Sequence, residues 1–95
     1  MRGGYAIQLT DKFERDYKAL PPDIRERADA CIRDLAQDPL PPGRRMHSVT
    51  PRGQKPTIYT VDVTANKAYK LSFHLQGNVA VLRRVADHRT IDRAP

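Results

Sequence analysis

The sequence carries three histidines, His47, His74 and His88, and a histidine can act as an acid or a base near neutral pH. All three lie after residue 38, where ten of the 17 lysines and arginines also lie. Lysine and arginine can hold a phosphate and the charge that develops on it. The second part of the chain therefore combines the groups that proton transfer and phosphate binding require.

The distribution of charge indicates a polyanionic partner for this second part. Residues 1–38 hold seven lysines and arginines against eight acids, a net charge of −1. Residues 39–95 hold ten against three, a net charge of +7, so the whole chain carries +6. In the first part, acids and bases recur at helical spacing and match each other's charge, which argues against a DNA-recognition helix. The basic part suits nucleic acid, an acidic protein or an anionic surface.

Length and apolar content restrict the class of protein. A chain of 95 residues predicts a single domain over residues 1–95 with one modest core. The longest apolar run, Val79–Leu82, is too short for a membrane span or a signal-peptide core, which predicts a cytoplasmic protein without membrane contact. Cys31 is the only cysteine and the histidines show no paired spacing, so we expect no metal site and no cofactor.

The first part of the chain predicts a short strand followed by two helices. Residues 5–9 alternate as a strand does, and a helix over residues 12–20 follows, with Thr10-Asp11 as its N-cap. Pro21-Pro22 breaks this helix, and Pro22 can open a second one that runs to about Gln37. The positions that the two helices would bury are Phe13, Tyr17, Leu20, Ile24, Ala28, Cys31 or Ile32, and Leu35.

The second part predicts a loop followed by strands. Residues 38–56 are basic and rich in proline, and a loop of this length is functional or conceals a short strand, around residues 46–49. Three strand-like runs follow over residues 57–63, 67–75 and 78–85, joined by hairpin turns, and residues 87–93 form about one helical turn. The order β-α-α-β-β-β predicts the α+β class: two N-terminal helices packed on a mainly antiparallel sheet of about four strands.

Strand alternation predicts where the basic side chains of the sheet point. The apolar residues of the run 67–75 would face the helices, so Lys70, Ser72 and His74 must face the opposite side, which the helices leave open. On the last strand, the same alternation places Arg84 outward and Arg83 near the core. We therefore expect the anion site on this open face.

These elements, in this order and spacing, resemble the RelE/ParE superfamily of bacterial type II toxins over nearly the whole chain. The segments that carry the resemblance are Leu35–Pro39, the basic loop Pro41–Val49, the hairpin segment Ala68–Phe73, the strand Val79–Val85 and the C-terminal Val85–Arg93. Three positions depart from the family's pattern. Lys70 stands where the family commonly has arginine, Ala86 replaces a glycine, and Asp92 replaces an aromatic residue that often stacks on a base.

The resemblance implies an activity and a set of site residues. The nuclease members cut mRNA in the ribosomal A site without a metal: the RNA's own 2′-OH attacks the adjacent phosphate, which needs a base, cations and an acid. On this resemblance we expect His88 to be the general acid or base, Lys70 to stabilise the transition state and Arg84 to hold the phosphate. The residues expected to bind RNA are Arg44, Arg45, His47, His74, Arg83 and Arg89. The alternative for His88 and Lys70 is an ordinary solvated side chain.

Three functions stay open at this point. The first is an endoribonuclease toxin that cleaves mRNA on the ribosome and so inhibits translation. The second is a ParE-like toxin that poisons DNA gyrase without cutting RNA, and the third is a RelE-fold protein that binds RNA without catalysis. Between the first two, His88 and Lys70 favour the nuclease, whereas Asp92 in place of an aromatic residue partly offsets that preference. In each case the resemblance implies a cognate antitoxin as partner, acidic or amphipathic where it crosses the basic face.

Overall fold

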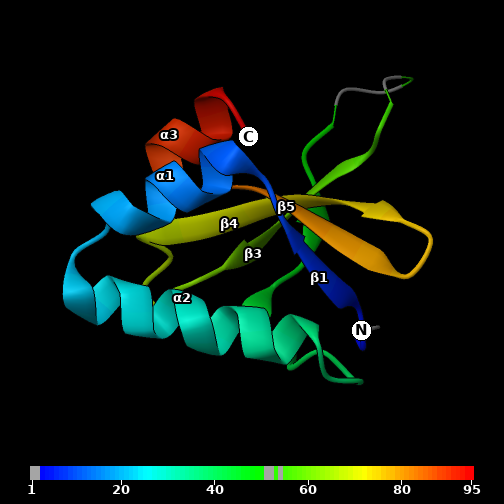
Figure 1. Ribbon diagram of the computed structural model, residues 1–95, viewed down its shortest axis with the longest axis horizontal. Coiled ribbons are helices and arrows are strands. Elements are labelled where there is room, and N and C mark those ends of the chain that lie inside the picture. Colours follow the sequence, from blue (N-terminus) through cyan, green and yellow to red (C-terminus); the bar gives the residue numbers. More distant parts are fainter. Residues whose placement is uncertain (1–2, 51–52, 54) are drawn as a thin grey trace.

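The computed structural model describes residues 3–50, 53 and 55–95 (Figure 1). Its elements in chain order are β1 (Ala6–Leu9), α1 (Asp11–Ala19), α2 (Pro22–Leu35), the 3-10 turn η1 (Pro42–Arg44), β2 (His47–Ser48), β3 (Ile58–Asp62), β4 (Tyr69–Gln76), β5 (Val79–Asp87) and α3 (His88–Arg93). Over these described residues, no helix is long and apolar enough to cross a membrane.

The strands form one sheet in the order β1-β5-β4-β3-β2. β1 runs parallel to β5, and the other neighbouring strands are antiparallel, so the predicted α+β class and mainly antiparallel sheet are confirmed. The sheet has five strands rather than about four. The additional one is β2, which pairs His47 with Thr60 inside the segment where the sequence indicated a concealed strand.

The two N-terminal helices begin and end at the signals that the sequence supplies. Thr10 is the N-cap of α1, and its hydroxyl accepts a hydrogen bond from the backbone N–H of Phe13 at 3.1 Å. Pro21 ends the turn that follows α1, and Pro22 occupies the first position of α2, where its fixed φ suits a helix. The hydroxyl of Tyr17 donates to Asp29 at 2.7 Å and ties the two helices together.

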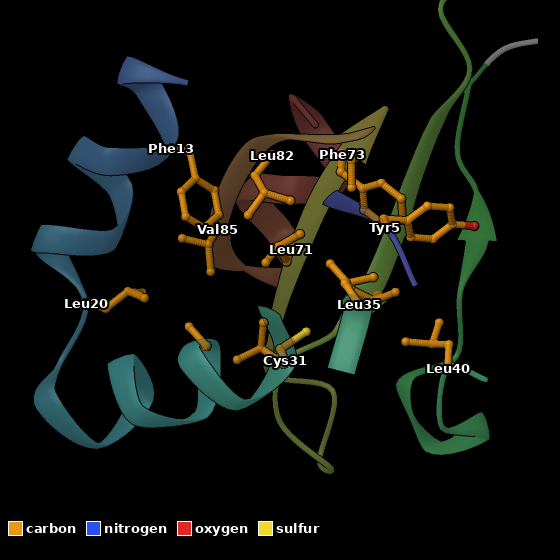
Figure 2. Packing of buried hydrophobic residues seen from close by; sticks show 14 residues of the cluster. Tyr5, Phe13, Leu20, Cys31, Leu35, Leu40, Leu71, Phe73, Leu82 and Val85 are labelled. Atoms are coloured by element: carbon orange, nitrogen blue, oxygen red, sulfur yellow. The ribbon is translucent and has the colours of Figure 1, made fainter. Parts of the chain in front are cut away.

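The hydrophobic core fills the space between α1, α2 and the sheet (Figure 2). Phe13 of α1 and Cys31 and Leu35 of α2 are at most 1% exposed, as the helical periodicity predicts. They meet Leu71 and Phe73 of β4, which are fully buried. This packing fixes which face of β4 is inside, and the period of two then turns Lys70, Ser72 and His74 to the other face.

That other face is partly covered, which corrects the expectation that the helices leave it open. α3 packs against β4 and β5, on the far side of the sheet in the view of Figure 2. Ile91 of α3 is 1% exposed although it lies outside the main core cluster, and Ser72 beneath is fully buried. The short polar C-terminal segment thus forms a helix that packs on the sheet, because the apolar side chain of Ile91 anchors it there.

Candidate functional site

The polar and ionisable side chains that could bind RNA or transfer a proton lie on the sheet face opposite the core, which we call the outer face. It is defined by Thr60 of β3, by Lys70, Ser72 and His74 of β4, and by Val81 of β5, which the strand register places side by side. The outer face therefore carries a lysine at one end of β4 and a histidine toward the other, roughly 13 Å apart at the usual rise per residue.

Lys70 and His88 lie at the same end of the outer face. Lys70 pairs in register with Ala86, and the backbone N–H of His88 donates to the carbonyl of Ala68 at 2.9 Å. The structure therefore places the backbones of these two residues, one on β4 and the other at the start of α3, at the same end of the sheet. His88 is exposed at the first position of α3, where a substrate can reach its ring.

A carboxylate lies beside Lys70. Its ammonium is 3.5 Å from Asp92 Oδ1 of α3, and the side chains are 16% and 54% exposed respectively. Asp92 is the residue that stands in place of the family's aromatic side chain. Where the family commonly has an aromatic ring, this chain therefore holds a negative charge that pairs with Lys70.

Asp87 fixes the start of α3 and so the position of His88. Its side chain is the N-cap and accepts from the backbone N–H of Thr90 at 3.3 Å. Hydrogen bonding from Thr90, followed by the charges of His88 and Arg93, lowers the pKa of Asp87 below its ordinary value. The cap therefore stays ionised at neutral pH.

Arg84 is held by a carboxylate of α1. Its Nε and Nη2 donate to Asp16 Oδ2 and Oδ1 at 3.0 and 3.1 Å, and the backbone N–H of Val85 donates to the same carboxylate at 3.3 Å. Both side chains are less than one-fifth exposed. Two parallel N–H···O bonds make a strong and oriented pair. Arg84 thus joins α1 to β5, and its role as a phosphate ligand stays a prediction.

The interpretation that Arg83 lies near the core is wrong, whereas Arg84 faces outward as predicted, because it pairs in register with Ser72 of the outer face. Ser72 pairs with Arg84 but the next residue of β4, Phe73, pairs with Leu82, so Arg83 is the extra residue of a β-bulge. The bulge breaks the alternation from which the interpretation came. Arg83 instead reaches the outer face, where its Nη1 lies 3.3 Å from Nδ1 of His74.

The contact with Arg83 defines the state of His74. A guanidinium has only donors, so Nδ1 of His74 must accept, and the ring proton then sits on Nε2. Burial, with the charge of Arg83 as the second cause, lowers the pKa of His74 below its ordinary value. His74 is therefore neutral at pH 7.

In the basic loop, Arg44 is held by contacts with the rest of the protein, whereas Arg45 is mostly exposed. Arg44 donates to Asp34 at 2.7 Å and to the carbonyls of Asp62 and Val63 at 3.1 Å, which fastens η1 to α2 and β3. These contacts use its Nε and Nη1 groups and give it a structural role, and its binding of RNA stays a prediction. Arg45, which is 60% exposed, lies 3.7 Å from Asp62.

His47 lies at the edge of the outer face. Its Nε2 is 3.3 Å from the hydroxyl of Thr60 and its Nδ1 is 2.9 Å from the carbonyl oxygen of Arg45. Arg89 is exposed on α3, next to His88. His47, Arg45 and Arg89 thus surround the outer face from two sides, and their binding of RNA stays a prediction.

Sequence reasoning missed two charged residues that the structure brings to this region. Lys12 of α1 lines a cavity with His74 and Arg83, and Asp16 holds Arg84. Ser72, which the alternation does place on this face, has a buried hydroxyl without a hydrogen-bond partner among the described residues. The matched charges within the first helix hid Lys12 and Asp16, because each has an oppositely charged neighbour at helical spacing. Among the described residues, no group of three or more histidine, cysteine or acidic side chains is arranged to hold a metal ion.

Comparison with known proteins identifies the fold. Neither a comparison with protein-family models nor one with curated proteins finds a match to this sequence. Among solved structures, the chain is similar to one in the RelE–RelB complex from Pyrococcus horikoshii OT3, with a TM-score of 0.67 and 12% identity over 88% of this chain and 94% of that one.

Two further structures give the same result. A chain of the RelB–RelE antitoxin–toxin complex from Methanococcus jannaschii matches with a TM-score of 0.68 and 20% identity, covering 93% of this chain and 98% of that one. YafQ from E. coli matches with a TM-score of 0.64 and 13% identity, covering 92% and 97%. The RelE-like architecture expected from the sequence is therefore confirmed: the chain has the fold of the RelE and YafQ toxins.

Proposed function

We propose that this protein is the toxin of a type II toxin–antitoxin pair and that it is an endoribonuclease that cleaves mRNA on the ribosome. The observation that carries the proposal is the meeting of Lys70 and His88 at one end of the outer face. A cation and an exposed imidazole in one place are what cleavage of a phosphodiester requires. The likeness in fold to RelE and YafQ supports the same conclusion.

The reaction follows from the chemistry of RNA. The 2′-OH attacks the adjacent phosphorus while a base removes its proton, the bond from phosphorus to the 5′-oxygen breaks, and an acid protonates that oxygen. The products are a 2′,3′-cyclic phosphate and a 5′-OH. His88 carries out one of the two proton transfers, and Lys70 stabilises the negative charge of the pentavalent phosphate. The RNA supplies the nucleophile, so this mechanism needs no metal.

The proposal includes an antitoxin that covers the outer face. Residues 39–95, which build most of that face, carry a net charge of +7, with ten basic residues against three acids. Two of the similar structures are complexes of RelE with RelB. A partner segment that is acidic or amphipathic complements this charge and blocks Lys70 and His88 from RNA.

The test is a reconstituted translation reaction in which the 5′ ends of ribosome-bound mRNA are mapped. We expect cleavage by the wild type and a loss of about 100-fold or more for His88→Ala, because acid–base catalysis contributes on that order. Lys70→Ala should lower the rate as well, whereas Lys18→Ala, an exposed lysine on α1, serves as the matched control and should cleave normally. Thermal unfolding of each variant establishes that the fold is intact.

Three outcomes would contradict the proposal. Wild-type cleavage that persists undiminished in both His88→Ala and Lys70→Ala would show that other residues form the site. No cleavage at all, together with inhibition of gyrase supercoiling, would support the ParE-like alternative. Binding to mRNA without cleavage would support the non-catalytic alternative.

A further inference from the structure

The proposed cleavage of RNA needs two groups that transfer protons, and His88 supplies only one of them. Residues 39–95, which build most of the outer face, hold three acids: Asp62, Asp87 and Asp92. A carboxylate can take the proton of a 2′-OH when it lies within hydrogen-bond reach of that group. Exposure and existing contacts show which of the three acids a substrate can reach.

Two of these acids are engaged within the protein itself. Asp62 is 4% exposed and its carboxylate lies 3.7 Å from Arg45, so a ribose cannot approach it. Asp87 is the N-cap of α3 and accepts from the backbone N–H of Thr90 at 3.3 Å. This hydrogen bonding lowers the pKa of Asp87, which makes its carboxylate a weaker base. Asp92 is the acid that remains.

Asp92 is exposed and lies beside the lysine proposed to hold the scissile phosphate. Its Oδ1 is 3.5 Å from Nζ of Lys70, and its side chain is 54% exposed. In RNA, the 2′-OH and the phosphate that it attacks belong to the same nucleotide, so a base must lie next to the cation that holds this phosphate. Asp92 lies there, and once the phosphate takes its place at Lys70 the exposed carboxylate can turn to the 2′-OH.

Asp92 and His88 lie on the same side of α3. They are four residues apart on this helix, a spacing that brings their Cβ atoms to within about 5–6 Å of each other. Both residues are exposed, while Ile91 between them is 1% exposed and fixes the helix on the sheet. Because the attacking and leaving oxygens lie on opposite sides of phosphorus, the reaction needs an acid and a base on either side of one phosphate. An imidazole and a carboxylate at this spacing meet that need.

We propose that Asp92 is the general base of the cleavage and His88 the general acid. The inference rests on the proposed function and names the group for its second proton transfer. The Asp92 carboxylate takes the proton of the 2′-OH as the 2′-oxygen bonds to phosphorus. The imidazolium of His88 gives its proton to the 5′-oxygen as the bond from phosphorus to that oxygen breaks. Exchange with water then removes the proton from Asp92 and returns one to His88.

The test separates catalysis from binding. Cleavage of ribosome-bound mRNA is followed in single turnover over a series of protein concentrations, which gives the rate at saturation and the concentration for half-saturation. We expect Asp92→Asn to lower the saturating rate by about 100-fold or more, because acid–base catalysis contributes on that order. Its half-saturating concentration should equal that of the wild type or lie below it, because asparagine no longer competes with the phosphate for Lys70.

Two further variants serve as comparisons. Asp92→Glu keeps the carboxylate and should retain more of the saturating rate than Asp92→Asn. Glu26→Gln, which removes an exposed negative charge on α2, is the matched control and should cleave as the wild type does. Thermal unfolding of each variant establishes that the fold is intact.

The outcomes distinguish this inference from the proposed function. If the wild type cleaves and Asp92→Asn cleaves as fast or faster, Asp92 only competes with RNA for Lys70; the inference is then overturned, although the proposed function stands. A loss in Asp92→Asn that appears only as a higher half-saturating concentration would assign Asp92 to binding and would overturn the inference as well. No cleavage by the wild type would overturn both.

Discussion

The ammonium of Lys70 on β4 lies 3.5 Å from a carboxylate oxygen of Asp92 on α3. This pair joins the residue proposed to hold the scissile phosphate to the residue that replaces the family's aromatic side chain. Lys70 is only 16% exposed, whereas Asp92 is 54% exposed. The lysine is therefore held at the sheet while the carboxylate is free to turn into solvent, and an RNA phosphate that binds Lys70 must displace Asp92.

Replacing Asp92 should strengthen the binding of RNA. An exposed ion pair is worth up to about 1 kcal/mol, so Asp92→Asn should lower the Kd for a 2′-O-methyl RNA oligomer by as much as about five-fold. In a Lys70→Gln background the same change should give little or no gain. Glu26→Gln, which removes an exposed negative charge on α2, controls for net charge. An equal gain with and without Lys70 would show a general charge effect and contradict the competition.

The pair of Arg84 and Asp16 should contribute to stability. Asp16 accepts two bonds from Arg84 and one from the backbone N–H of Val85, and both side chains are less than one-fifth exposed. Asp16→Ala leaves a half-buried guanidinium without its partner, which should lower the free energy of unfolding by about 2 kcal/mol. Urea unfolding monitored by circular dichroism measures the change. Glu26→Ala should cost far less, and equal losses in the two variants would mean that the pair adds nothing specific.

The fully buried hydroxyl of Ser72 should be dispensable. Its Oγ lies under α3 without a hydrogen-bond partner among the described residues, and a buried unsatisfied polar group costs about 1–3 kcal/mol. Ser72→Ala removes that group with almost no change in volume, so the melting temperature should rise. Ser48→Ala on the exposed strand β2 should leave it unchanged. A lower melting temperature for Ser72→Ala would show that the hydroxyl does have a partner in solution.

Much of the fold follows from residue periodicity. The positions of Phe13, Ala28 and Leu35 on helical stripes, and the alternation of β4, predict the core and the face on which Lys70 and His74 lie. The bulge at Arg83 leaves no mark on the alternation of the sequence, so the prediction that Arg83 lies near the core was wrong, while the predicted outward facing of Arg84 was correct.

Contacts between residues that are far apart in the chain could not be predicted from the sequence either. Asp16 and Arg84 are 68 residues apart, and nothing local to either residue indicates the other. The packing of α3 depends on a single apolar residue, Ile91, which is too little for a periodic signal. The composition of the outer face could therefore be predicted, but not which of its cations are already paired.

Cys31 should be inert in the native state. It is fully buried in α2, its Sγ lies 3.8 Å from the carbonyl oxygen of Asp62, and burial raises the pKa of its thiol to about 12. The thiolate is the reactive form, so both access and ionisation oppose reaction. Labelling with a disulfide reagent such as DTNB should be complete within seconds in concentrated urea and should proceed under native conditions only through unfolding. Rapid native labelling would show that α2 opens locally.

The stability of the protein should fall as the pH drops through the range in which a free histidine is protonated. Burial and the neighbouring Arg83 lower the pKa of His74 below its ordinary value of 6.5, so the unfolded chain binds a proton more readily than the folded one. The free energy of unfolding should therefore be unaffected by this group above that value, decrease as the pH falls below it, and level off once the folded-state pKa is passed.

The test is urea unfolding of the wild type and of His74→Gln, which lacks the titrating group, over a series of pH values. The free energy of unfolding of the wild type should fall relative to that of the variant as the pH drops through this range, and their difference should be constant outside it. A His74→Gln variant whose stability follows the same pH curve as the wild type would contradict the lowered pKa of His74.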